Sequence, residues 1–128
     1  MAYRLLTTIT ACIVLFAVAS GGYKLAGGEA DVRIFASLGM TPLVVRLFGL
    51  VQAVAGLAVL WRPIGTLAAV LLLLCNTLAT AGLYAAGEQP FAVISWIFVA
   101  MAGMAVQWAR VRSRGGLAPS SAAGVPAR

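Results

Sequence analysis

Four stretches of this chain are apolar over the length that an α-helix needs to cross a bilayer: residues 5–25, 43–61, 64–86 and 91–109. The hydrocarbon core of a membrane is about 30 Å thick, which about 20 helical residues span. Because lipid offers no partner to backbone N–H and C=O groups, such runs are restricted to hydrogen-bonded helices. The sequence therefore predicts one transmembrane domain, residues 1–109, with four spans.

The composition agrees with a lipid environment. Hydrophobic residues make up 62% of the 128 residues and charged residues 9%, whereas a soluble domain carries roughly 25% charged residues. The net charge of +6 comes largely from single basic residues between apolar runs. No continuous basic face exists to follow a phosphate backbone, so we do not expect nucleic-acid binding. The expected partner is the lipid bilayer.

Turn residues separate the predicted spans. Thr41-Pro42 closes the first loop, Arg62-Pro63 forms the second, and residues 87–90 form the third. The second and third connections are so short that the helices they join must be antiparallel neighbours. We therefore predict an all-α fold, a polytopic membrane four-helix bundle.

The basic residues orient this bundle. One side of the predicted topology carries Arg4, Arg62, Arg110, Arg112, Arg114 and Arg128. On the opposite side, Lys24 and Arg33 are offset by acidic residues. Because cytoplasmic segments of membrane proteins carry the excess of Lys and Arg, both termini are predicted to lie in the cytoplasm. The predicted location is a bacterial-type plasma membrane, as a multi-pass protein.

The first apolar run permits a second interpretation. Arg4, about fifteen apolar residues and Ala17-Val18-Ala19 also satisfy the pattern of a cleaved signal peptide. The apolar character continues past that site to Leu25, however, which makes a full span. We expect the run to be retained. Cleavage would remove one span without changing the orientation of the others.

Two segments outside the spans have patterns of their own. Within residues 30–38, Ile34, Phe35 and Leu38 recur at helical spacing, which predicts a short amphipathic helix on the outer membrane interface. Residues 110–128 form a basic tail that continues with Gly, Ala, Ser and Pro and lacks apolar periodicity. We predict that this cytoplasmic tail is disordered.

Polar residues inside the predicted spans are the first candidate site. Arg46 and Gln52 lie in the second span, and Asn76 and Thr80 lie in the third. They could form a polar seam that faces a quinone, a lipid or a small solute. Alternatively they hold the helices together, because interhelical hydrogen bonds and small residues stabilise helix packing in lipid. The sequence leaves both interpretations open.

Charged residues on the predicted outer side form a second candidate group. Arg46 stands about one turn inside its span, where a charge is costly unless it reaches the interface or finds a partner. Acidic residues on the same side could supply that partner, and Lys24 could join it in a site that faces an anion. The predicted outer charged cluster consists of Lys24, Glu29, Asp31 and Glu88.

The sequence offers few of the residue combinations on which catalytic sites are commonly built. Because the chain has no histidine, it offers no histidine-ligated haem and no Ser–His or Cys–His nucleophile pair. Its three acidic residues lie in predicted loops and supply neither a metal cage nor paired carboxylates. Cys12 and Cys75 lie in apolar runs, where a thiol behaves as a small hydrophobe. We expect no metal, no haem and no self-contained active site.

Three segments, in order, carry a family resemblance: Ser20-Gly21-Gly22-Tyr23-Lys24-Leu25, residues 35–42 and the Gly-containing residues 47–60. Together they resemble the DoxX and DoxX-like family of small four-helix membrane proteins, over about residues 4–109. In that family the segment that matches residues 20–25 belongs to the first helix, which favours its retention here. Many members have a glutamate at the position of Gln52, so the resemblance carries no acid-dependent role over to this chain.

The resemblance implies a role beside a membrane redox system. Some members look like membrane subunits of quinone-linked sulfur oxidoreductases, and others are associated with redox-stress enzymes. We therefore expect an accessory subunit or scaffold for a quinone-linked redox system, with a redox enzyme as partner and a quinone as candidate cofactor. The alternatives are a small solute or lipid carrier, which would form a homo-oligomer because four short helices enclose little volume, and a purely structural membrane protein.

Overall fold

The structure, a computed structural model, describes residues 1–115 and contains five helices in this part of the chain. They are α1 (Ala2–Leu25), α2 (Glu29–Ala36), α3 (Pro42–Ala58), α4 (Gly65–Ala85) and α5 (Gln89–Gly115). Three of them, α1, α4 and α5, are long and apolar enough to cross a membrane, and α3 is a shorter apolar helix of 17 residues. This is the architecture of a small polytopic membrane protein.

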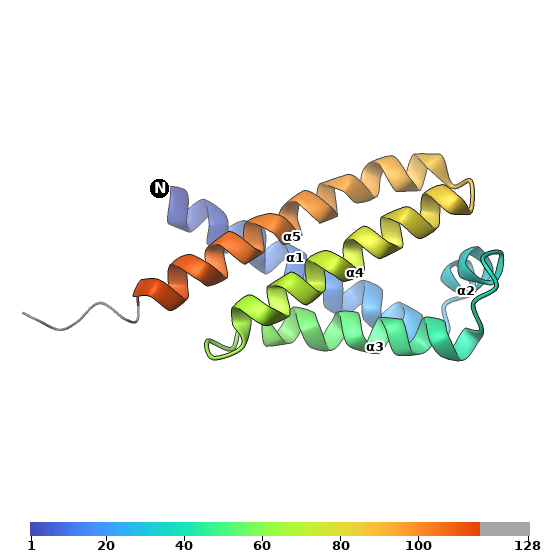
Figure 1. Cartoon of the computed structure of the whole chain (residues 1–128), viewed down its shortest axis with the longest axis horizontal. Helices are drawn as coiled ribbons and strands as arrows, with labels where there is room; N and C mark the ends of the chain where they lie inside the picture. Colours follow the sequence, from blue (N-terminus) through green and yellow to red (C-terminus); the bar gives the residue numbers. More distant parts are fainter. Residues whose placement is uncertain (116–128) are drawn as a thin grey trace, which may run out of the picture.

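The four longer helices pack as a bundle in the order α1, α3, α4, α5 (Figure 1). The most extensive contacts are those of α1 with α3 and of α4 with α5, while α1–α5 and α3–α4 contacts close the ring. Met1, the α3–α4 turn and the end of α5 lie at one end of the bundle, here called the terminal end. The short helix α2 and the α4–α5 turn lie at the opposite end, here called the α2 end.

Local sequence explains where the helices begin and end. Thr41 caps α3 by accepting a hydrogen bond from the Val44 backbone N–H (3.4 Å), and Pro42 occupies the first helical position. At the other end of α3, the ring of Pro63 would clash with the Val59 carbonyl in a continuous helix. The helix therefore stops at Ala58. Gly87 follows α4 with a φ of 80°, a left-handed conformation that glycine adopts without strain.

Small residues allow the backbones of α1 and α3 to touch. A Cβ atom built on Gly21 would lie 2.5 Å from the Gly49 carbonyl oxygen, and one on Gly49 would lie 2.6 Å from the Gly21 carbonyl oxygen. A Cβ on Gly56 would meet the Ala17 Cβ at 2.7 Å. These contacts are possible only without side chains, as in other close helix crossings in membranes. They hold α1 against α3 from Gly49 to Gly56.

The terminal half of the bundle is filled by an apolar core. Fully buried side chains from α1, α4, α5 and the turn after α3 meet there: Ile13, Ala17, Val59, Ala69, Leu72, Ala102 and Ala105. The Trp108 indole N–H also donates to the Thr7 hydroxyl (3.0 Å), which ties α5 to α1. The interior of this half is therefore closely packed.

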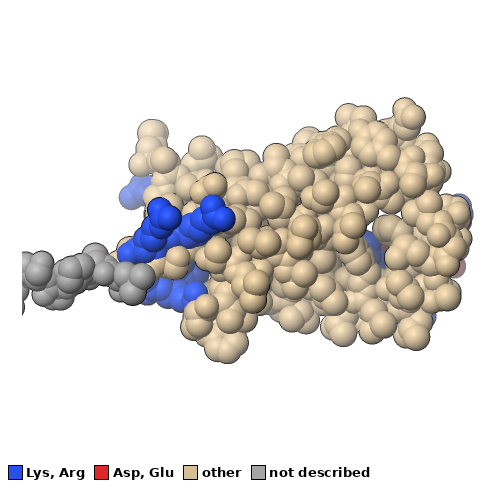
Figure 2. Space-filling view, viewed as in Figure 1, with Lys and Arg blue, Asp and Glu red and all other residues tan. Residues whose placement is uncertain are grey.

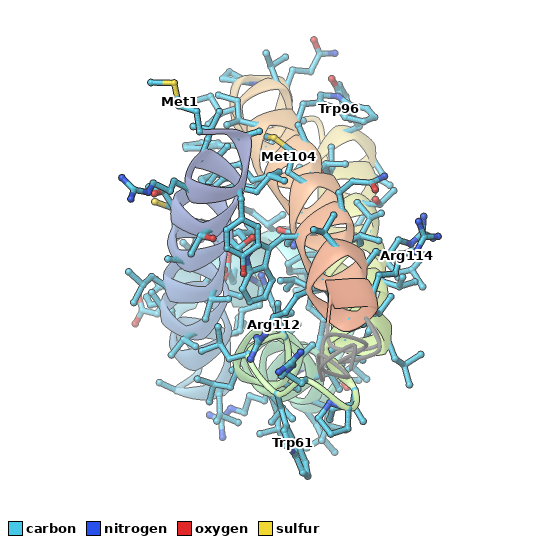
Figure 3. All side chains as sticks on the ribbon, turned by 90° about the vertical axis from the view of Figure 1, so that its left-hand side faces the viewer. Met1, Trp61, Trp96, Met104, Arg112 and Arg114 are labelled. Atoms are coloured by element: carbon cyan, nitrogen blue, oxygen red, sulfur yellow. The ribbon has the colours of Figure 1, made fainter. Side chains whose placement is uncertain are left out.

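Basic residues gather at the terminal end, where Figure 2 shows a cluster of Lys and Arg atoms. Figure 3 looks onto this end, with Arg112 beside the α3–α4 turn and Arg114 pointing away from the bundle. Arg112 donates to the Leu60 carbonyl (2.9 Å), and Arg62 donates to the Arg112 carbonyl (3.3 Å). The Arg112 guanidinium also lies 4.9 Å from the centre of the Trp108 ring. Charge at this end thus also anchors the α3–α4 turn to α5.

The number and type of the helices agree with the sequence-based prediction, but only three of the four predicted spans are helices long enough to cross a membrane. The boundaries differ by three or more residues at three ends. Helix α1 begins at Ala2, three residues before the predicted span. The second predicted span, residues 43–61, ends as a helix at Ala58 because of the turn before Pro63. The fourth, residues 91–109, continues as a helix to Gly115, so the basic residues at the start of the predicted tail are helical. The rest of that tail, residues 116–128, lies outside the described residues. The short helix predicted within residues 30–38 is present as α2.

Candidate functional site

A cavity of about 440 Å³ lies inside the α2 end of the bundle. The helices α1, α3, α4 and α5 surround it, and α2 covers it. In Figure 2 a hollow opens toward the right-hand end of the molecule, with Lys or Arg atoms visible at its floor. The cavity exists because the α1–α3 pair and the α4–α5 pair diverge at this end (Figure 1).

The amide of Gln52 is the least satisfied polar group in this cavity. Gln52 projects from α3, is 2% exposed and lines the cavity. Within residues 1–115, its Oε1 atom has no hydrogen-bond partner. A buried carbonyl oxygen without a partner costs about 1–3 kcal/mol. The arrangement therefore favours a ligand that donates a hydrogen bond at this point.

Hydroxyl and amide groups of α4 and α5 line the opposite wall. The Asn76 Nδ2 atom donates to the Leu72 carbonyl (2.8 Å), and the Thr80 hydroxyl donates to the Asn76 carbonyl (2.9 Å). The Thr80 and Ser95 hydroxyls lie 2.7 Å apart, within hydrogen-bond distance. Asn76 and Ser95 face the cavity, and Thr80 lies buried behind them. Asn76 retains its side-chain oxygen and a second N–H for other partners.

A buried lysine stands at the side of the cavity nearer α2. Lys24 is 5% exposed, donates to the Ser20 hydroxyl (2.8 Å) and pairs with Asp31 of α2 (Nζ–Oδ2, 3.4 Å). Arg33 and Glu88 also line the cavity. The two positive and two negative side chains cancel in formal charge. The lining as a whole is therefore neutral, although it holds four charged groups.

Aromatic side chains form the apolar walls. The rings of Phe16 (α1) and Phe98 (α5) are stacked with their centroids 3.7 Å apart and their planes 7° apart. Both rings line the cavity and also pack against the apolar core, so they close the cavity toward the terminal end. Phe35 of α2 and Phe91 of α5 line it nearer the α2 end. A flat ring can stack against such walls.

The structure brings together most of the residues that the sequence singled out. Gln52 and Asn76 from the predicted polar seam, and Lys24, Asp31 and Glu88 from the predicted charged cluster, line one cavity. Of the other three, Thr80 lies buried behind the wall, within hydrogen-bond distance of Ser95, and two lie apart from the cavity.

Those two residues are Arg46 and Glu29. Arg46 is exposed, and its guanidinium lies against the loop after α1, since a Cβ on Gly27 would be 2.8 Å from its Nη2 atom. Glu29 is exposed in the first turn of α2 and does not line the cavity. Its carboxylate is placed favourably for the helix dipole. Neither residue therefore contributes to the cavity wall.

Sequence reasoning missed other parts of this wall. Ser20 lies four residues before Lys24, one helical turn away on the same face, and that spacing was a readable signal. The stacked pair Phe16 and Phe98 carried no such signal, because single aromatic residues in apolar runs are common. Arg33 was noted only for its charge. The cavity thus has more apolar and more basic lining than the polar residues of the spans suggested.

Comparison of the chain with protein-family models, with curated protein sequences and with solved structures gave no match. The geometry alone therefore describes what the cavity can do. It offers hydrogen-bond donors and acceptors, flat apolar walls and no net charge. Among the described residues, no group of three His, Cys, Asp or Glu side chains lies close enough to hold a metal ion. Such a cavity is suited to binding.

Proposed function

We propose that this chain is an accessory membrane subunit that holds a quinone head group in the cavity for a partner redox enzyme. The observation that carries this proposal is the buried Gln52 side chain, whose Oε1 atom has no hydrogen-bond partner among residues 1–115, in a neutral cavity with aromatic walls. The proposal keeps the resemblance to the DoxX-like family, an orientation with both termini in the cytoplasm and a bacterial-type plasma membrane as the location. The α2 end would then face the outer side.

The cavity fits a quinone head group in size and chemistry. Its volume of about 440 Å³ lies within the range of roughly 300–1,000 Å³ that is common for small-molecule sites. A quinone ring is flat, uncharged and apolar on its faces, and it presents two carbonyl oxygens at its edge. The Gln52 and Asn76 amide N–H groups can donate to a carbonyl, and the Gln52 oxygen can accept from the hydroxyl of the reduced quinol.

The chain itself supplies binding in this proposal, and the partner supplies the electron-transfer centres. A bound quinone would supply the redox chemistry, because it takes up electrons and protons to become a quinol and gives them back when it is oxidised. This chain orients the ring between the phenylalanine walls and keeps its polar edge on the amides. Lys24 and Asp31 hold α2 over the cavity and so restrict the access of water. No acidic side chain inside the helices is required for these tasks.

The packing of the terminal half weighs against the alternative of a solute carrier. A carrier must open its binding site to both sides of the membrane in turn. Here the cavity ends at Phe16 and Phe98, and fully buried side chains such as Ile13 and Leu72 fill the bundle beyond them. A path through the bundle would require this core to separate. The geometry favours a site that does not open at the terminal end.

The test replaces the Gln52 amide by an isosteric apolar group. Gln52→Leu nearly keeps the side-chain volume and removes the donor and the acceptor. Because Gln52 Oε1 has no partner among the described residues, we expect the free energy of unfolding to stay the same or rise. Binding of the reduced dimethoxy-methyl-hydroquinone head group, whose hydroxyl can donate to the Gln52 Oε1 atom, should weaken about tenfold, the value of one lost hydrogen bond. Native mass spectrometry and thermal unfolding in detergent measure the two quantities.

The matched control is Gln107→Leu, because Gln107 is an exposed glutamine of α5 that lines no cavity. It should leave quinone binding unchanged. If Gln52→Leu lowers stability by about 1 kcal/mol and leaves binding intact, Gln52 holds helices together and the proposed site is wrong. Affinity purification of the chain followed by mass spectrometry tests the other half of the proposal. Recovery of the chain without a redox enzyme would contradict an accessory role.

A further inference from the structure

A second, fully apolar hollow adjoins the cavity at the α2 end. It has a volume of about 220 Å³ and lies between α2, α3 and α4. Its walls include Leu38, Phe48, Leu78 and Gly82, and none of its lining residues is charged. Leu78 is 63% exposed, so the hollow opens on the side of the bundle that faces lipid. We call it the lateral groove.

The lateral groove and the cavity share two wall residues, Phe35 and Ala79. Phe35 is 7% exposed and fills the space between α3 and α4 at the α2 end. Its ring lies against Gly82, where an added Cβ would be 3.0 Å from the Phe35 Cε1 atom, and its centroid is 6.3 Å from that of Phe48. Ala79 adds only a methyl group beside it. The boundary between the two hollows is therefore one aromatic ring and one methyl group thick.

We infer that the two hollows hold the two ends of one ligand: a membrane amphiphile with a neutral, hydrogen-bonding head group in the cavity and a hydrocarbon tail in the lateral groove. The head group is neutral because the charges of Lys24, Arg33, Asp31 and Glu88 cancel. The tail passes between Phe35 and Ala79 and leaves the bundle beside Leu78. This inference rests on the proposed function for the position of the head group and adds the tail and its route.

This arrangement also assigns a route of entry. A ligand dissolved in the bilayer reaches the lateral groove directly from lipid, because the groove opens between α3 and α4. The polar rim of the cavity, with Lys24 and Asp31 joined at 3.4 Å, lies on the α2 side instead. An amphiphile that enters sideways leads with its head group, and its tail moves from lipid into the lateral groove. The route does not require the Lys24–Asp31 ion pair to break.

The experiment compares ligands with and without a tail on matched variants. Leu78→Trp fills the lateral groove and leaves the residues of the cavity unchanged. The control is Leu74→Trp, one turn earlier on α4, because Leu74 is 54% exposed and lines neither hollow. Native mass spectrometry measures the binding of dimethoxy-methyl-benzoquinone with and without a decyl tail. A second pair of probes, monodecanoyl glycerol and monoacetyl glycerol, tests a neutral lipid head group in the same way.

The tailed quinone should bind the unsubstituted protein and Leu74→Trp about tenfold more tightly than the bare ring, through van der Waals contacts in the groove. Leu78→Trp should abolish that difference and leave binding of the bare ring unchanged. If the bare ring binds and the tail adds nothing, or adds as much in Leu78→Trp, the inference is wrong and the proposed function stands. If only the glycerol pair shows the Leu78-dependent difference, the tail route stands and the quinone proposal fails. If no probe binds, both fail.

Discussion

Substituting Gly21 by alanine tests the contact on which the bundle depends most directly. The added Cβ would lie 2.5 Å from the Gly49 oxygen and 2.8 Å from the Ala53 nitrogen, whereas ordinary van der Waals contact begins at 3.4 Å. Both atoms belong to the backbone of α3 and cannot rotate away. The two helices must therefore separate by several tenths of an ångström along their contact. Overpacking of this kind costs about 1–3 kcal/mol.

The neighbouring glycine provides the control for this substitution. Gly22 lies on the exposed face of α1, and a Cβ there would meet nothing within 4 Å. Both substitutions replace glycine by alanine in the same helix, so the effect of helix propensity, about 0.8–1.0 kcal/mol in favour of alanine, cancels in the comparison. We expect Gly21→Ala to be about 1–3 kcal/mol less stable than Gly22→Ala, measured by reversible unfolding in mixed micelles.

Gly49, on the α3 side of the same contact, provides a second test. Gly49→Ala should be destabilising for the same reason, because its Cβ would meet the Gly21 oxygen at 2.6 Å. Once one methyl group has separated the helices, the second finds more room, so the double variant should cost less than the sum of the two single variants. Equal stability of Gly21→Ala and Gly22→Ala would refute the close contact between α1 and α3. If the double variant loses the full sum of the two single effects, Gly21 and Gly49 do not share one contact.

Three further predictions concern charges and topology. Asp31→Asn should lower the free energy of unfolding by about 3 kcal/mol, because it leaves the buried Lys24 ammonium without its counter-charge. Lys24→Met should lower it by less than about 1 kcal/mol, because the Asp31 side chain is 24% exposed and can be hydrated. Thermal unfolding measures both variants, and the reverse order would contradict the ion pair. Arg112→Ala should lower the free energy of unfolding by about 1–2 kcal/mol, because it removes the hydrogen bond to Leu60 and the contact with Trp108. Arg114→Ala should leave the free energy of unfolding unchanged in the same assay. An N-terminal tag should remain on the mature protein and resist protease added outside intact cells, and a mature N-terminus at residue 20 would contradict retention of α1.

The lengths and boundaries of the helices were largely readable from the sequence because they depend on local chemistry. Apolar runs of about 20 residues, the Thr41-Pro42 start of α3 and the Pro63 stop each act within a few residues of the chain. Which helices pack together depends on the whole molecule. The short connections predicted α3–α4 and α4–α5 neighbours, and both pairs are in contact. The extensive α1–α3 contact was not predicted, because it depends on Gly21 meeting Gly49 in space.

Part of the candidate site could also be predicted from the sequence, because it depends on single residues that stand out locally. A polar residue in an apolar span is visible in the sequence, and Gln52 and Asn76 are buried as such residues must be in lipid. Arg46 was predicted to share one polar seam with Gln52, which lies six residues later in the same helix. Six residues turn a helix by about 600°, so the two side chains point about 120° apart. The volume of the cavity depends on how far the helix pairs diverge, and no residue pattern encodes that distance locally.

The contact between α5 and α1 has a consequence for how the chain is assembled during synthesis. The hydrogen bond between the Trp108 indole and the Thr7 hydroxyl joins residues 101 positions apart, so α1 gains its contact with α5 only after α3 and α4 have been made. Until α3 follows, α1 has no backbone partner for its glycine face. A chain arrested before Gln89 would hold α1 on α3 and leave the remaining faces of α1 and α4 to lipid. Closure of the ring of α1, α3, α4 and α5 therefore has to wait until α5 has been made.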